Sequence, residues 1–258
     1  RDRISASRYI GYSKIVDGVV RPLWGELRLP DDEKGLTQLV KDFADAQRKL
    51  LSDEDARRRA GKKRKTIRPA TYNERVKTVR HFFSWLYDNH HIDQIPRRVP
   101  TLLSKYKVTS SAKALDTDLI HALWREADDE LKCYMALALN CGHYAVDIAT
   151  LKQDDLQDGY IVTDRNKTGV PVRFKLWGVT QTLLERCANG NGTGLMFETD
   201  DGEALVTYDV EKNSRRSTID LKLLSIRKKV GITGVSFSHF RDTSTTHIES
   251  IDRRYTDI

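Results

Sequence analysis

A seam of apolar side chains at helical spacing constrains the fold of this chain more than any other feature. Between residues 69 and 89 the apolar positions recur at steps of four, three, four and three, and Pro69 stands where a starting helix tolerates its missing N–H. The seam consists of Tyr72, Val76, Val79, Phe83 and Leu86. A second stripe over residues 36–51 consists of Leu36, Leu39, Val40, Phe43, Ala46 and Leu50. Because such helices must bury their apolar faces against each other, residues 36–107 are predicted to form a small helical bundle.

The pattern changes after residue 107. Residues 108–113 are small and polar, as linkers are, and we place a domain boundary there. Beyond it, Asp116 or Thr117 is expected to cap one helix, and the apolar run 131–139 predicts a second, deeply buried one. The β-rich runs 159–163 and 170–176 predict a hairpin, and the rest is predicted to be helical. The predicted fold class is α+β, mainly α with a small β-hairpin or sheet, and residues 114–258 form the second domain.

The first 35 residues form a separate N-terminal segment without a clear helical period. Apolar residues alternate around Asp17-Gly18, and Asp-Gly supplies the positive φ that a tight turn needs. This pattern predicts a short hairpin in residues 1–35.

Composition excludes several classes of protein. Hydrophobic residues make up 39% and charged residues 31%, which is typical of a soluble globular chain rather than a disordered or membrane-spanning one. Cys133, Cys141 and Cys187 lie far apart and outside any CxxC spacing, so neither a disulfide framework nor a zinc site is expected. Buried thiols in a reducing cytoplasm are the simplest interpretation. No signal peptide is recognisable, although a chain that begins at Arg1 makes this weak evidence.

The net charge of +7 is distributed unevenly. Residues 1–110 contain 25 Lys and Arg against 14 Asp and Glu, a net charge of +11, whereas the remaining 148 contain 19 against 23, a net of −4. Eight of the twelve residues in 57–68 are Lys or Arg, and none is acidic. A field of this sign attracts polyanions such as nucleic acid. The basic run is either an arm against a phosphate backbone or a solvated charge run without a partner.

Four stretches together resemble one family. Residues 71–87 look like the last long helix of a core-binding domain, and residues 137–155, which include Asn-Cys-Gly-His-Tyr, are similar to a first catalytic box. Residues 167–171 (Lys-Thr-Gly-Val-Pro) resemble a Lys-Thr-Gly hairpin turn, and residues 237–247 (Phe-Ser-His-Phe-Arg-Asp-Thr-Ser-Thr-Thr-His) resemble a second box. In this order and spacing, from about residue 36 to the end, the set resembles the tyrosine recombinase (phage integrase) family.

The resemblance implies a chemistry. In this family a tyrosine hydroxyl attacks phosphorus in double-stranded DNA, which gives a 3′-phosphotyrosyl link and a free 5′-hydroxyl, with no metal, cofactor or small-molecule substrate. Arg241 matches an arginine that binds the phosphate, and Lys167 matches the general acid on the hairpin. His239 is a candidate proton carrier, with a packing or hydrogen-bonding role as the alternative. An ordinary surface arginine and a solvated turn lysine are the alternatives for the other two.

The remaining candidate residues are cations expected to contact DNA phosphates rather than to take part in the chemistry. They are Arg64, Lys65, Arg68, Arg75, Lys77 and Arg80 in the first domain, and Arg165 and Arg173 on the hairpin. The family also implies self-association on DNA, as a tetramer, and a cytoplasmic protein located on DNA rather than at a membrane.

The sequence departs from the family at three points. Tyr144 stands where the first box has an arginine, as in a subgroup of bacterial integrases with an Asn-Cys-Gly turn, while Asp147 matches the acidic residue that follows. Ser238 stands where the second box has a histidine, with His239 one place along. The nucleophilic tyrosine is expected beyond Ile258, so this chain is predicted to be truncated and unable to cleave DNA.

Three functions therefore stay open. The first is a site-specific recombinase or integrase. The second is a recombinase-like DNA-binding regulator that never cleaves, which Tyr144 and Ser238 favour. The third, an RNA-binding protein, lacks any stacking motif. The target sequence and the role in integration, excision or resolution are not encoded in a recognisable pattern.

Overall fold

The computed structural model describes residues 5–51, 67–108, 114–164, 169–189 and 194–256, with backbone alone for residues 248–256. It divides into two compact units, residues 1–110 with 210–213 and residues 111–209 with 214–258. As predicted, the fold is mainly α with small antiparallel sheets.

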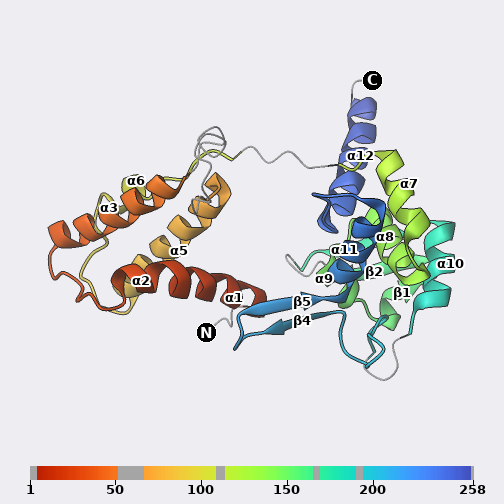
Figure 1. Cartoon of the computed structure of the whole chain (residues 1–258), viewed down its shortest axis with the longest axis horizontal. Coiled ribbons are helices and arrows are strands. Elements are labelled where there is room, and N and C mark those ends of the chain that lie inside the picture. The colour runs from red at the N-terminus through yellow and green to blue at the C-terminus, as the bar shows by residue number, and fades with distance from the viewer. Residues whose placement is uncertain (1–4, 52–66, 109–113, 165–168, 190–193, 257–258) are drawn as a thin grey trace. The chain divides into compact units, whose positions relative to one another are not determined.

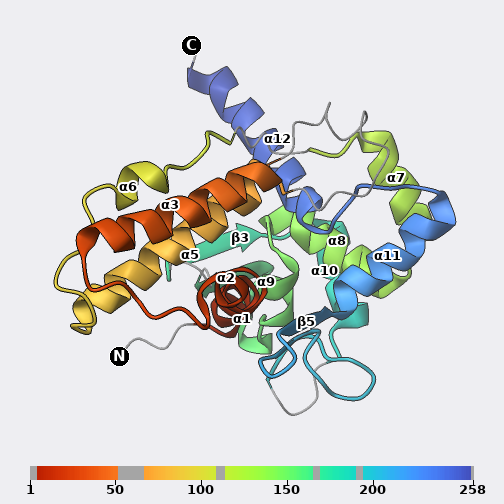
Figure 2. The ribbon, with the colours of Figure 1, turned by 60° about the vertical axis from the view of Figure 1, so that its left-hand side comes forward.

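The first unit is helical throughout its described elements (Figures 1 and 2). In order they are α1 (Ala6–Ile15), a π-helical turn η1 (Val16–Val20), α2 (Arg21–Trp24), α3 (Glu33–Leu50), α5 (Pro69–Asp88) and α6 (Val99–Leu102). Figure 2 shows α3 and α5 running alongside each other.

The predicted seam of α5 forms the core of this unit. All five seam residues are buried, as are Leu36, Val40 and Phe43 of α3. Asp32 caps α3, because its side chain accepts the N–H of Gly35 at 3.1 Å. The periodicity therefore predicted both helices and the faces by which they pack.

The hairpin predicted in residues 1–35 is wrong. Residues 6–24 are helical, and Gly18 does not adopt the positive φ that the turn required. The reason is tertiary packing: Val19, Val20 and Trp24 lie against the core of the unit, which a two-stranded hairpin would not bring about. Asp17 instead forms an i,i+4 ion pair with Arg21.

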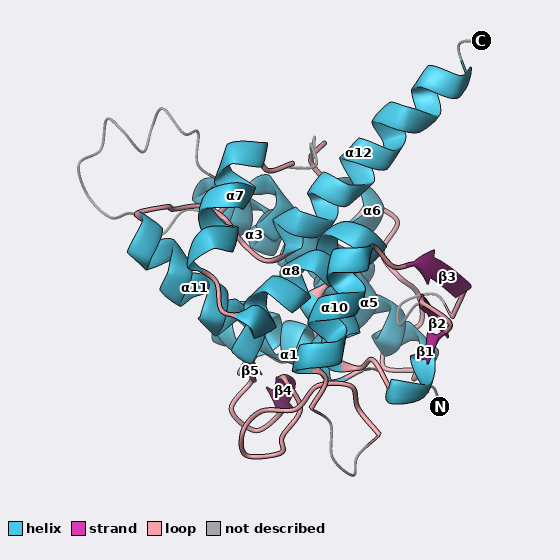
Figure 3. Ribbon diagram, turned by 90° about the vertical axis from the view of Figure 1, so that its right-hand side faces the viewer, coloured by secondary structure: helices cyan, strands magenta, loops and turns pink. Residues whose placement is uncertain are grey.

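The second unit is built around one buried helix, α8 (Asp129–Cys141), which contacts α9 (Ala145–Ala149), α10 (Gly178–Cys187), α11 (Thr218–Val230), α12 (Ser238–Thr256) and β3. α7 (Thr117–Glu126) packs on α11. Figure 3 shows α12 extending away from the other elements of this unit. The thiols of Cys133 and Cys141 are buried on α8, and burial raises the pKa of Cys141 to about 12, so both are neutral packing groups.

Two small antiparallel sheets complete the second unit. After a 3₁₀ turn, η2 (Gln153–Asp155), strands β1 (Leu156–Gln157), β2 (Tyr160–Asp164) and β3 (Pro171–Lys175) pair in that order, with Ile161 opposite Phe174. This confirms the predicted hairpin. A second hairpin, β4 (Val206–Asp209) with β5 (Ser214–Ser217), lies where only helix was predicted. Its connection contains no glycine, and Asn213 takes the positive φ instead, so the usual turn signal is missing.

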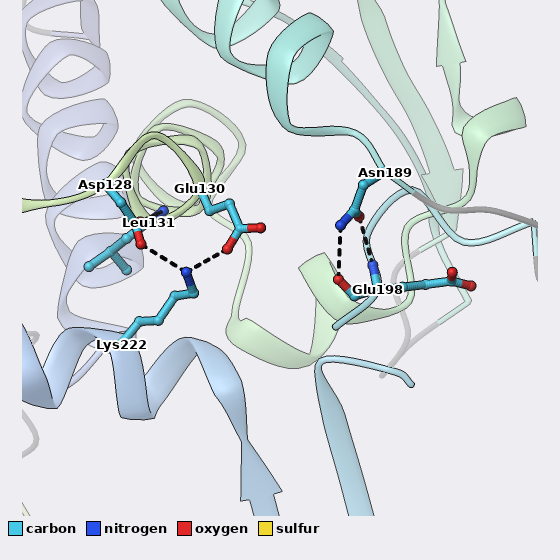
Figure 4. A network of polar contacts seen from close by, with 6 residues as sticks. All are labelled: Asp128, Glu130, Leu131, Asn189, Glu198 and Lys222. Atoms are coloured by element: carbon cyan, nitrogen blue, oxygen red, sulfur yellow. Dashed lines mark hydrogen bonds and ion pairs between the residues drawn. The ribbon is translucent and has the colours of Figure 1, made fainter. Parts of the chain in front are cut away.

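A polar network fixes the N-terminal end of α8 (Figure 4). Asp128 caps the helix through the N–H of Leu131 at 2.8 Å and also accepts a hydrogen bond from Lys222 of α11 at 2.8 Å. Lys222 bridges to Glu130 as well. A separate pair of hydrogen bonds joins Asn189 to the backbone of Glu198. The contacts of Lys222 with Asp128 and Glu130 hold α8 and α11 together at the surface.

Candidate functional site

The turn between α8 and α9 is held in a defined shape by its own residues. Gly142 ends α8 with φ 65°, a left-handed conformation that glycine adopts without strain. Asn140 donates to the carbonyl of Lys175 at 3.0 Å and accepts the N–H of Trp177 at 2.7 Å. The Asn-Cys-Gly run thus joins the end of β3 to the end of α8.

Tyr144 begins the next helix. The carboxylate of Asp147 accepts the Tyr144 N–H at 2.8 Å, so the capping contact fixes the backbone of Tyr144. The side chain of Tyr144 is 40% exposed. A well-anchored backbone therefore presents a partly exposed aromatic ring at this turn.

Arg241 of α12 lies over this ring. The guanidinium carbon of Arg241 is 4.0 Å from the centroid of the Tyr144 ring, which is cation–π range. A Cβ placed on Gly142 would lie 4.0 Å from both Cγ of Arg241 and Oγ of Ser244. The two boxes recognised in the sequence therefore meet in space. Among the residues that the structure describes, no carboxylate forms an ion pair with the guanidinium of Arg241, which lies over the Tyr144 ring.

His239 lies on the same helix but not on the same face. α12 runs without interruption from Ser238, and side chains three apart share a helix face whereas those two apart do not. Ser238 therefore shares the face of Arg241, and His239 does not. The Nδ1 atom of His239 accepts the N–H of Ser236 at 3.3 Å, which leaves Nε2 as the ring nitrogen that carries the proton in the neutral form.

The β2–β3 hairpin carries the remaining predicted residues of the second unit. Lys167 and Arg165 fall outside the described residues, between the end of β2 and the start of β3. Arg173 is exposed on β3, with its guanidinium carbon 3.9 Å from the centroid of the Tyr160 ring. Of the predicted site arginines in this unit, the two that the structure describes, Arg173 and Arg241, both lie over tyrosine rings.

The predicted DNA-contacting cations of the first unit differ in their surroundings. Arg64 and Lys65 lie outside the described ranges, Arg68 is exposed at the N-terminal end of α5, and Lys77 is half-buried. Two others have structural partners. Arg75 donates to Gln47 at 2.7 Å, and burial lowers its pKa; Arg80 donates to the carbonyl of Pro100 at 2.6 Å.

The described part of the chain places no three His, Cys, Asp or Glu side chains together as metal ligands. No helix within the described ranges is long and apolar enough to cross a membrane.

Two features of the site were missed by the sequence reasoning. The cation–π contact of Tyr144 joins residues far apart in the chain and has no sequence signal of its own. The role of Asn140 was also missed, although its place directly before a helix-ending Cys-Gly was a usable signal for a side-chain clamp.

Comparison with solved structures identifies the fold. A lambda integrase fragment (75–356), solved as a dimer bound to a COC′ core site, has a TM-score of 0.62 and 18% identity, with 94% of this chain and 82% of the fragment covered. A lambda integrase tetramer bound to a Holliday junction has a TM-score of 0.62 and 19% identity, with coverages of 94% and 67%. A longer lambda integrase chain, solved as a dimer bound to a COC′ core site, matches 94% of this chain, and the match covers 64% of the longer chain. No family model and no curated protein matches the sequence.

These neighbours define the class of fold. The chain has an α+β fold that it shares with lambda integrase over nearly its whole length. The particular solved proteins that it resembles are lambda integrases bound to a COC′ core site or to a Holliday junction.

Proposed function

We propose that this chain binds double-stranded DNA as part of a site-specific recombinase of the tyrosine type. The observation that carries the proposal is the meeting of two sequence boxes at Arg241, whose guanidinium has no acidic partner among the described residues. The fold neighbours add support, since lambda integrase was solved bound to a core site and to a Holliday junction.

In the proposed reaction a tyrosine hydroxyl gives up its proton to solvent as its oxygen attacks a backbone phosphorus. The P–O5′ bond breaks, and the departing 5′ oxygen takes up one proton. Arg241 binds the non-bridging oxygens, where negative charge accumulates in the transition state. A guanidinium offers two parallel donors to such a phosphate, which a lysine does not. Lys167 supplies this proton. His239 lies off the face of Arg241 and accepts the N–H of Ser236, which favours its hydrogen-bonding role over proton transfer. The proposal assigns the attacking tyrosine to none of residues 1–258.

The basic first unit is proposed to contact DNA phosphates. Its net charge of +11 over residues 1–110 supports this role, and the family's tetrameric assembly on DNA is proposed with it. Arg68, which is exposed, is a better candidate than Arg75 or Arg80, whose guanidinium groups already have partners in the fold.

A salt titration tests this proposal. Affinity for duplex DNA should fall steeply with salt, and replacing Arg64, Lys65 and Arg68 together with Ala should flatten the log–log slope by up to about three units, since each lost phosphate contact removes about 0.9. A matched control removes the same charge elsewhere, through Ala at Lys34, Lys41 and Lys49, which are exposed on α3. Equal slopes for the two variants would show that net charge alone acts, and would remove the arm from the proposal.

A second candidate function is a DNA-binding regulator that performs no strand chemistry. It is favoured by Tyr144 and Ser238, which stand where the recombinase pattern has an arginine and a histidine. The complete gene product, incubated with a nicked duplex and run on a denaturing gel, distinguishes the two: a protein–DNA adduct supports the recombinase, and no adduct on any bound site supports the regulator. An adduct formed by residues 1–258 alone would contradict the assignment of the tyrosine made above.

A further inference from the structure

We propose that Tyr144 is the positioning residue of Arg241: its ring is a platform that holds the guanidinium ready for a phosphate. This inference deepens the proposed function and rests on it for the identity of the anion. The platform itself is a property of the free protein and is testable without DNA.

The first support is the geometry of the contact. The guanidinium carbon of Arg241 stands 4.0 Å from the centroid of the Tyr144 ring. A ring face attracts the cation electrostatically without using up its N–H donors in hydrogen bonds. The donors of Arg241 therefore remain available, which would not be so if a carboxylate held the side chain in place.

The second support is the rigidity of the platform. The N–H of Tyr144 is held by Asp147 at 2.8 Å, and its carbonyl accepts the N–H of Ile148 at 3.1 Å. Ile148 is fully buried, so the short helix that begins at Tyr144 is anchored in the core. The Tyr144 ring is attached to a fixed backbone, whereas the arginine side chain is long and flexible. Contact with the ring therefore restricts the arginine before the phosphate binds, which lowers the conformational entropy lost on binding.

The third support is the close packing of the arginine stem. The Cγ of Arg241 lies near the Cα of Gly142, where an added Cβ would be in van der Waals contact at 4.0 Å. The stem therefore passes over the α8–α9 turn before the guanidinium reaches the ring. The stem and the head are both guided by the same turn, so a replacement of Tyr144 should release the head without unfolding the helix.

The experiment compares Tyr144→Phe, which keeps the ring face, with Tyr144→Leu, which removes it. In the free protein, NMR of arginine side chains should show the Arg241 signals shifted upfield by the ring; the signals are assigned through Arg241→Lys. The shift should persist in Tyr144→Phe and disappear in Tyr144→Leu. Tyr160→Leu is the matched control, because it should move the signals of Arg173 and not those of Arg241.

The functional readout is duplex DNA binding, measured by fluorescence anisotropy. Tyr144→Leu should weaken affinity about two- to five-fold, the usual strength of such a contact, and Phe should restore it. In an Arg241→Ala background the Leu substitution should have no further effect. Tyr87→Leu, an exposed tyrosine of α5 with no described ring partner, controls for loss of an aromatic surface.

Each outcome decides the matter. An absent ring shift in the unmodified protein overturns the platform, and so does a loss of affinity in Phe equal to that in Leu, which would assign the role to the hydroxyl. An intact ring shift in a protein that binds no DNA keeps the platform and refutes the proposed function. The platform and the proposed function are both supported if the unmodified protein shows the ring shift and only Tyr144→Leu, not Tyr144→Phe, binds DNA more weakly.

Discussion

Asp128 offers the sharpest test of how the second unit is held together. Its carboxylate does two things: it caps α8 through the N–H of Leu131, and it pairs with Lys222 of α11 (Figure 4). Replacement by Asn keeps a capping oxygen and removes the charge, whereas replacement by Ala removes both. The pair of substitutions therefore separates the cap from the ion pair.

The expected magnitudes follow from the environment. Loss of an N-cap costs about 1 kcal/mol of the free energy of unfolding. The side chain of Asp128 is 57% exposed, so solvent screens its ion pair, which is worth about 0.5 kcal/mol. Asp128→Asn should thus cost about 0.5 kcal/mol and Asp128→Ala about 1.5 kcal/mol. Lys222→Met in the Asn background should add less than it does alone, because the charge that it pairs with is already gone.

The ion pair also has a pH signature. Burial acts to raise the pKa of Asp128, but the hydrogen bonds from Lys222 and from the Leu131 N–H outweigh it, and the pKa is lowered. A carboxylate with a lowered pKa in the folded state stabilises fully above its unfolded pKa, about 3.9, and loses this contribution as pH falls through the folded value. The deficit of Asp128→Asn should therefore be complete at pH 7 and shrink below about pH 4.

Urea unfolding followed by far-UV circular dichroism measures the deficit. Hydrogen exchange of the α8 amides assigns it to the second unit, since the Leu131 N–H should exchange faster in Ala than in Asn. A deficit of Asn as large as that of Ala, or one independent of pH between 3 and 7, would refute the division into cap and ion pair.

Four further substitutions, compared in two pairs, probe the first unit and the site. Arg80→Ala should cost about 1.5 kcal/mol of stability, because it removes a charged hydrogen bond to a backbone carbonyl, whereas Arg68→Ala should stay within about 0.5 kcal/mol; thermal unfolding compares them, and equal effects would contradict the structural role of Arg80. Gly142→Ala should cost about 1 to 2 kcal/mol from its left-handed φ, since the nearest atoms at 4.0 Å leave room for the methyl group. Gly142→Asn should cost less in the same unfolding assay, and the reverse order would show that space, not φ, decides.

The sequence predicted those parts of the fold in which local pattern and tertiary packing agree. The seam of α5 and the β2–β3 hairpin are examples: periods of 3.6 and 2 are direct consequences of which face is buried. The segment around Asp17-Gly18 shows the opposite case. Its local turn signal is real, but packing of Val19 and Val20 on the core of the first unit outweighs it.

The site was predicted only in part, for a similar reason. The order of the motifs predicted Arg241 as a site residue, because an arginine just before a Thr-rich stretch is a recognisable pattern. Motif order did not predict the contact between Tyr144 and Arg241. This contact depends on where two distant segments meet, which is set by the packing of α8 against α12. The register of α12 also places His239 and Arg241 on different faces, which their spacing of two residues implies once both are known to lie on one helix.

The buried helix α8 connects the stability of the second unit to the geometry of the site. One end is fixed by Asp128 and Lys222, and the other ends at Gly142, directly before the turn that presents Tyr144. Because the body of α8 is buried, a displacement at its capped end is transmitted along a rigid element rather than absorbed. Loss of the cap in Asp128→Ala should therefore also alter the contact between Tyr144 and Arg241. The ring-current shift of the Arg241 signals in this variant measures that coupling. An unchanged shift in a destabilised variant would show instead that the turn is held from its own side, by Asn140 and the end of β3.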